Sequence, residues 1–247
     1  MFLRSLVVLC ICSLQLYADP MSVLDRFQKK VSSVASLKAM VECKQEYRSV
    51  TKKGKGKLWY SRDWGIRYSV SSPGSYEFYN SDDLVYGVNA NRKRGWRLHN
   101  AEHDQQMRMR IDPLYRLLYI AKADRNKFTY RGTGKGLMLF SMQDTDGMRY
   151  QVAIDIHLHC CWLIETFDST GKLVHKASFV YGTDNDAYGI PRTITSSEVV
   201  GSSVTVDKVT FKRVVVNKGI ERSVFGVPQN ITWRQWANNG SRKKHLD

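Results

Sequence analysis

Residues 54–70 read GKGKLWYSRDWGIRYSV, and this stretch decides the fold prediction. In a β-strand, side chains two residues apart share a face. If the stretch forms one strand, its apolar face carries Leu58, Tyr60, Trp64, Ile66, Tyr68 and Val70. Arg62 falls on the same face, so the pattern predicts a guanidinium among apolar side chains.

The segments on either side alternate with the same period of two. Leu37, Ala39 and Val41 alternate with polar residues from 38 to 48, which is typical of a strand with one buried face. Residues 51–54 are predicted to be a turn into the opening stretch, and residues 76–80 and 84–89 to be further strands. These patterns favour an antiparallel sheet.

Two segments have a helical period instead. From Ser22 to Ser33 the apolar residues recur at steps of three and four, with Ser22 placed as a cap. From residue 112 to 123, Asp112 is placed as an N-cap and Pro113 at the first helical position. The stripe of this second helix consists of Leu114, Leu117, Leu118 and Ala121.

Alternation returns from Phe128 to Phe225, with turn signals at residues 145–147 and 169–171. Strands of this spacing with scarcely a helix among them indicate one large antiparallel sheet that curls. The predicted fold class is therefore mainly β with helices (α+β), with a large curved antiparallel sheet.

The N-terminus has the pattern of an export signal. Arg4 precedes an apolar run from Leu6 to Leu14, and Ala18 is placed for cleavage. Acylation at Cys10 or Cys12 is the alternative interpretation. The predicted organisation is a signal peptide over residues 1–18, a single domain over residues 19–236 and a polar basic tail over residues 237–247.

The formal net charge of +15 favours anionic partners, and export argues against nucleic acid. His157, His159 and Cys161 share one face if residues 154–162 form a strand, which raises the possibility of zinc. A solvated strand face is the favoured interpretation, because ligands along one strand converge poorly. No nucleophile motif or phosphate loop is present, so neither an enzyme nor a cofactor is predicted.

The run Gly54-Lys55-Gly56-Lys57-Leu58-Trp59-Tyr60-Ser61-Arg62, followed by Ile66-Arg67-Tyr68, resembles a motif of the LolA-type periplasmic lipoprotein carriers. That motif is Gly-x-Gly-x-Leu-Trp-x-x-Arg-Pro followed by aromatic-x-Trp. The wider group includes outer-membrane lipoprotein-sorting proteins, LolB and the lipid-binding part of MucB/RseB. The likeness runs roughly from Ser22 to Phe225, and Asp63 departs from it where the family has proline.

The resemblance implies a half-open barrel covered by a helical lid, with acyl chains held between them. Arg62 would be a latch between sheet and lid, and the alternative is an edge residue whose head group reaches water. The implied cavity residues are Leu58, Tyr60, Trp64, Ile66, Tyr68, Leu114, Leu117, Leu118, Ala121, Ile156 and Leu158.

The implied function is a periplasmic carrier that binds acyl chains of lipoproteins or phospholipids and moves them toward the outer membrane. The implied partners are this cargo, an inner-membrane ABC transporter and an outer-membrane acceptor. The net positive charge adds an anionic membrane surface as an expected partner. The alternative is a MucB/RseB-like module that senses lipid or lipoprotein by binding a regulatory partner.

Overall fold

The computed structural model describes residues 19–71, 75–81, 84–89, 91–99, 112–182, 187–200 and 203–235. It contains a sheet in the order β14-β6-β5-β4-β3-β2-β1-β13-β12-β11-β10-β9-β8-β7. All neighbours pair antiparallel except β14 and β6. The strands are β1 (Ser36–Tyr47), β2 (Val50–Ser61), β3 (Gly65–Val70), β4 (Tyr76–Asn80), β5 (Leu84–Asn89), β6 (Arg94–His99), β7 (Phe128–Gly134), β8 (Leu137–Gln143), β9 (Arg149–Asp155), β10 (Cys161–Phe167), β11 (Leu173–Val180), β12 (Thr193–Val200), β13 (Ser203–Val216) and β14 (Thr232–Gln235).

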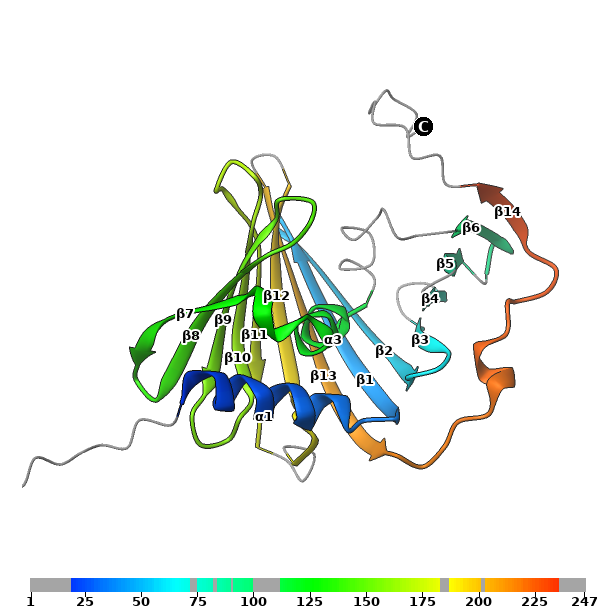
Figure 1. Cartoon of the computed structure of the whole chain (residues 1–247). Helices are drawn as coiled ribbons and strands as arrows, with labels where there is room; N and C mark the ends of the chain where they lie inside the picture. Colours follow the sequence, from blue (N-terminus) through cyan, green and yellow to red (C-terminus); the bar gives the residue numbers. More distant parts are fainter. Residues whose placement is uncertain are drawn as a thin grey trace, which may run out of the picture.

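Helices α1 (Pro20–Ser32) and α3 (Tyr115–Lys122) lie on the same face of the curved sheet (Figure 1). The sheet does not close, because its two edge strands are β14 and β7. The predicted fold class, a large curved antiparallel sheet with helices, is confirmed. In the part of the chain that the structure describes, no helix is long and apolar enough to cross a membrane.

Residues 54–70, expected to form one strand, form a hairpin. Residues 62–64 form a turn between β2 and β3. Gly65 follows the turn with a φ of 89°, and a Cβ there would lie 2.2 Å from the carbonyl oxygen of Asn80. Leu58 pairs with Tyr68 and Tyr60 with Ile66, so these four side chains still share the covered face. Arg62 and Trp64 lie in the turn, outside that face.

Several boundaries differ from the prediction. The turn before β2 is at residues 48–49 and not 51–54, because β1 and β2 pair over their full length, from Tyr47 opposite Val50. Helix α1 begins two residues early, since Asp19 and not Ser22 caps it. Helix α3 begins at Tyr115, although Asp112 still accepts a backbone hydrogen bond of 2.9 Å from Leu114.

The strand expected over residues 154–162 is also interrupted. Strand β9 ends at Asp155 and β10 begins at Cys161. Between them the Asp155 carboxylate accepts hydrogen bonds of 2.8 Å from the backbone N–H of His157 and 2.7 Å from that of Leu158. His159 has a φ of 51°. The predicted common face of the two histidines and Cys161 is therefore wrong.

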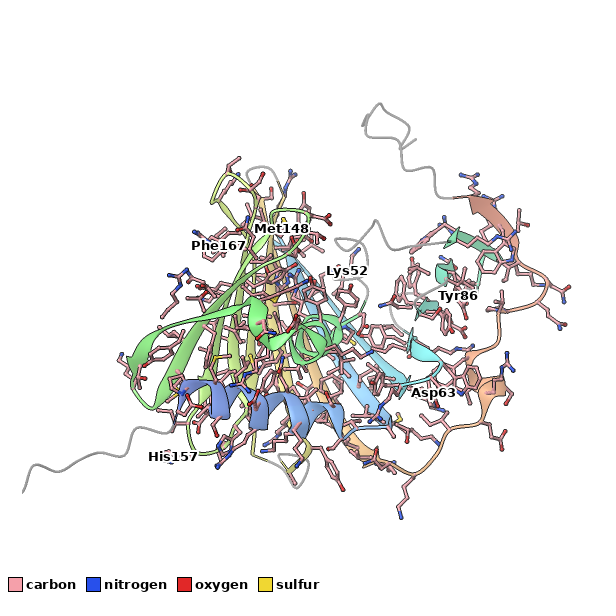
Figure 2. All side chains as sticks on the ribbon, viewed as in Figure 1. Lys52, Asp63, Tyr86, Met148, His157 and Phe167 are labelled. Atoms are coloured by element: carbon pink, nitrogen blue, oxygen red, sulfur yellow. The ribbon has the colours of Figure 1, made fainter. Side chains whose placement is uncertain are left out.

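Two separate groups of apolar side chains hold the structure together. The main core lies between the helices and the concave face of the sheet, and Leu24, Leu58 and Ile120 are fully buried in it. The second core lies around Tyr86 between β4, β5 and the segment after β13 (Figure 2). Strands β6 and β14, which border this second core, were not predicted from the sequence.

Candidate functional site

Helices α1 and α3 are joined to each other as a cover over the sheet. The Gln28 side-chain amide on α1 donates hydrogen bonds to the carbonyls of Ala123, at 2.8 Å, and Ile120, at 3.3 Å. These carbonyls lie at the end of α3, where intrahelical partners run out. Asp25 of α1 also forms an exposed ion pair of 2.8 Å with Arg125, just after α3. The two helices are therefore fastened to each other.

Arg62 connects the sheet to α1. Its guanidinium donates a hydrogen bond to the carbonyl of Ser32, the last residue of the helix. Its backbone N–H donates to the carbonyl of Ala35 at 2.9 Å. A cation is favourable at a helix C-terminus, where free carbonyls carry partial negative charge. The Arg62 side chain is exposed, so it contacts the end of α1 from outside the apolar interior.

A second arginine connects α3 to the sheet from inside. Arg116 is 8% exposed, and its Nη1 donates a 3.0 Å hydrogen bond to the Thr166 hydroxyl on β10. His175 on β11 is also buried. Burial, and then the charge of Arg116, lowers the pKa of His175 to about 2, so its imidazole is neutral. The concave face of the sheet therefore carries two buried polar side chains beneath α3, Thr166 and His175.

The space directly beneath α3 is filled by the protein's own side chains. Leu117 and Ile120 are fully buried, in one cluster with Phe140 and Phe179 of the sheet. Open volume lies beside the helix. A hollow of about 240 Å³, here called the slot, is lined by Val31, Ser32, Tyr60, Arg62, Leu118, Ala121 and Lys122.

A larger hollow of about 510 Å³, here called the mouth, adjoins the slot, and both are lined by Arg62, Leu118 and Lys122. Aromatic side chains make up much of its wall. The rings of Tyr115 and Tyr119 stack with centroids 6.0 Å apart. The Arg222 guanidinium lies 4.5 Å from the ring centroid of Trp64. Charged groups and aromatic rings together suit a boundary between apolar and wet surroundings.

The structure brings most of the predicted site residues together. Eight of them lie buried in the main core: Leu58, Tyr60, Ile66, Tyr68, Leu114, Leu117, Leu118 and Ala121. Ile156 is half-buried at its edge. Leu158 is 45% exposed in the loop after β9, and Trp64 packs against the second core. The slot and the mouth are together lined by six of the predicted residues: Tyr60, Arg62, Trp64, Ile66, Leu118 and Ala121.

Several residues of the mouth were not predicted. Arg222 and Phe225 come from a short helix, η4 (Arg222–Phe225), that the chain reaches only after β13. Tyr79 donates a hydrogen bond of 2.6 Å to the Trp64 carbonyl and so fixes the hairpin turn against β4. The sequence predicted a strand over residues 76–80 but not the contact of Tyr79 with the turn, and nothing in the sequence of residues 222–225 indicates where that segment packs.

The chemistry of the slot and the mouth is that of non-covalent binding. Burial raises the pKa of the Tyr60 hydroxyl, so this group stays protonated in the slot. Within the described residues, no group of three or more His, Cys, Asp or Glu side chains could hold a metal ion. An apolar slot that opens into a charged aromatic mouth suits a ligand with an apolar tail and a polar head.

Sequence comparisons give no relative: no family model matches the chain, and no curated protein matches it. Solved structures do match. A putative outer membrane lipoprotein-sorting protein domain from Vibrio parahaemolyticus superposes with a TM-score of 0.61 at 14% identity, over 83% of this chain and 95% of that one. Structures of MucB match with TM-scores of only 0.32 to 0.34, which are too low to establish a shared fold.

Two further structures agree with the first. A LolA superfamily protein from Nitrosomonas europaea has a TM-score of 0.58 at 8% identity, over 84% of this chain and 97% of that one. A DUF1329 family protein from Desulfovibrio piger has a TM-score of 0.59 at 12% identity, over 84% of this chain and 95% of that one. Such identities establish the fold alone. The protein therefore has the fold shared by the LolA superfamily and the outer membrane lipoprotein-sorting domain.

Proposed function

We propose that the protein is a non-catalytic periplasmic carrier that binds acyl chains of lipoproteins or phospholipids and moves them toward the outer membrane. The observation that supports this most directly is the junction of the slot with the mouth at Leu118. Acyl chains would enter the slot between α1, α3 and β2, and the polar head would remain in the mouth. The export signal predicted for residues 1–18, which lie outside the described residues, supports the periplasmic location.

The slot alone is smaller than most ligand pockets, which range from about 300 to 1,000 Å³. A full chain would therefore displace α3 and replace its side chains on the concave face. Displacing α3 breaks the buried hydrogen bond between Arg116 and Thr166, and releasing such a charge-assisted bond costs about 1.5–3 kcal/mol. Each buried methylene contributes about 0.8 kcal/mol, so a few methylenes of the bound chain offset the loss of this bond. Opening is thus reversible.

The proposal is tested by mass spectrometry of organic extracts from purified protein. Co-purifying acyl lipids are expected, and a protein that is always empty would contradict the proposal. The variant Ala121→Phe places a ring in the slot and should reduce the lipid content. Its control is Leu139→Phe, which changes a 44% exposed side chain on β8 and should leave the lipid content unchanged.

Transfer is a separate part of the proposal. Cargo would come from an inner-membrane ABC transporter and pass to an outer-membrane acceptor. Reconstitution with donor and acceptor vesicles tests it, because a carrier speeds exchange of a labelled lipid in proportion to its concentration. Exchange that stays at the rate of vesicles alone would contradict it.

A further inference from the structure

The convex face of the sheet, opposite the helices, carries a dense group of lysines on three neighbouring strands. All are exposed, and the group, here called the lysine face, consists of Lys38, Lys44, Lys53, Lys55, Lys57, Lys208 and Lys212. The acidic side chains on the same face of these strands are Glu42 and Glu46. Seven positive charges against two negative ones leave this face with an excess of five.

The register places like charges directly opposite one another. Lys44 on β1 pairs with Lys53 on β2 and with Lys208 on β13, so three lysines form one row across the sheet. Cross-strand partners of this kind lie about 4.5–5.5 Å apart at Cβ, and like charges there are destabilising. Stability of the fold therefore does not explain this row.

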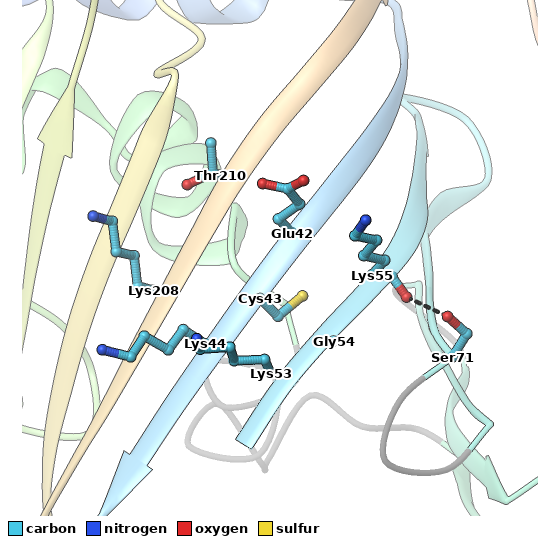
Figure 3. A pocket seen from close by; sticks show the side chains of 9 residues that line it. All are labelled: Glu42, Cys43, Lys44, Lys53, Gly54, Lys55, Ser71, Lys208 and Thr210. Atoms are coloured by element: carbon cyan, nitrogen blue, oxygen red, sulfur yellow. Dashed lines mark hydrogen bonds between the residues drawn. The ribbon is translucent and has the colours of Figure 1, made fainter. Parts of the chain in front are cut away.

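The row borders a hollow of about 580 Å³, which is also lined by Glu42, Lys55 and Thr210 (Figure 3). Glu42 forms an ion pair of 2.8 Å with Lys212, and Glu46 forms an ion pair with Lys44. In the part of the chain that the structure describes, Lys53 and Lys208 form no ion pair. Their ammonium groups are available to an external anion.

We propose that the lysine face binds the anionic phospholipid headgroups of a membrane surface. Lysine is a mobile point charge without the fixed fork of arginine, so the row suits many headgroups and not one bidentate ligand. Basic clusters of this size are attracted to anionic lipid surfaces. Met40, 39% exposed and directly opposite Lys57 and Lys212, adds an apolar contact within the cluster. Lysine stems extend that apolar area.

This binding goes beyond the loading of acyl chains and uses the opposite face of the sheet. A carrier bound by its convex face would keep the slot and the mouth directed away from that membrane. Lipid content and membrane binding are therefore measured separately. A protein that lacks acyl lipid would contradict the carrier proposal only, and a protein that does not bind anionic vesicles would contradict the membrane-binding proposal only.

The test is flotation of the full chain with vesicles of phosphatidylglycerol and phosphatidylcholine, compared with pure phosphatidylcholine. The unmodified protein should bind only the anionic vesicles, and less at high salt. The triple variant Lys44→Gln, Lys53→Gln and Lys208→Gln should bind about a hundredfold more weakly, from about a fivefold loss per lysine. It should fold well, because it relieves repulsion, and should retain its acyl lipid.

The control is the variant Lys127→Gln, Lys172→Gln and Lys218→Gln, which removes the same charge from exposed positions outside the lysine face. It should bind anionic vesicles within a few-fold of the unmodified protein. Equal weakening in both variants would show that only net charge matters and would overturn the proposal. So would absence of binding to anionic vesicles, or binding to polyglutamate alone, which would indicate an acidic protein partner.

Discussion

Arg116 on α3 and Thr166 on β10 form a 3.0 Å hydrogen bond inside the main core, between the covering helix and the sheet. Removing only the acceptor leaves a buried charge with one hydrogen bond fewer. The variant Thr166→Val should therefore lower the free energy of unfolding by about 1.5–3 kcal/mol. Urea denaturation measures this change.

The double variant Arg116→Met with Thr166→Val provides the control for that prediction. It replaces both members by apolar groups, which can be close to neutral for a buried hydrogen-bonded pair. We expect the double variant to be less destabilised than the sum of the two single variants. Strictly additive losses would show that the two side chains do not act as a pair.

Arg116 also shows where sequence reasoning reached its limit. The spacing of apolar residues from 114 to 121 correctly predicted a buried stripe of Leu114, Leu117, Leu118 and Ala121, because burial of a helix face follows from spacing. Spacing did not show that Arg116 is buried as well. That depends on Thr166, fifty positions later, being opposite α3. The alternation of β2 and β3 likewise gave the covered face but not the turn that places Arg62 outside it.

The contact between Arg62 and Ser32 leads to a prediction about exchange. The variant Arg62→Gln should barely change stability, by less than about 1 kcal/mol, because the side chain is exposed. Since it releases the end of α1 from the sheet, transfer of a fluorescent fatty acid from protein to vesicles should be about 3- to 10-fold faster. A stopped-flow assay measures this rate.

The matched control is Arg131→Gln. Arg131 donates a 2.6 Å hydrogen bond to Ser141 between β7 and β8, at the sheet edge and away from Ser32. Transfer by this variant should equal that of the unmodified protein. An unchanged rate in Arg62→Gln would leave Arg62 with a role in the hairpin turn only.

Because the His175 side chain is buried, we expect the stability of the protein to depend on pH. Its pKa is about 2 in the folded protein, lowered from 6.5 by burial and by the charge of Arg116. Between these values the unfolded chain binds a proton and the folded protein does not, so stability is full above pH 6.5 and falls as the pH falls. The loss at pH 5 should be about 2 kcal/mol. Urea titrations at several pH values, with His175→Leu as the non-titrating reference, isolate this contribution.

Gly56 in the opening stretch gives the sharpest test of how β2 packs against β3. A Cβ at this position would lie 1.8 Å from the carbonyl oxygen of Ser69, which is backbone and has little room to move. Gly56→Ala should therefore lower the free energy of unfolding by about 2–3 kcal/mol, as overpacking does. Gly134→Ala on β7 meets no atom within 4 Å and should change it by less than about 0.5 kcal/mol. Equal stability of the two variants would mean that β2 and β3 are not paired in this register.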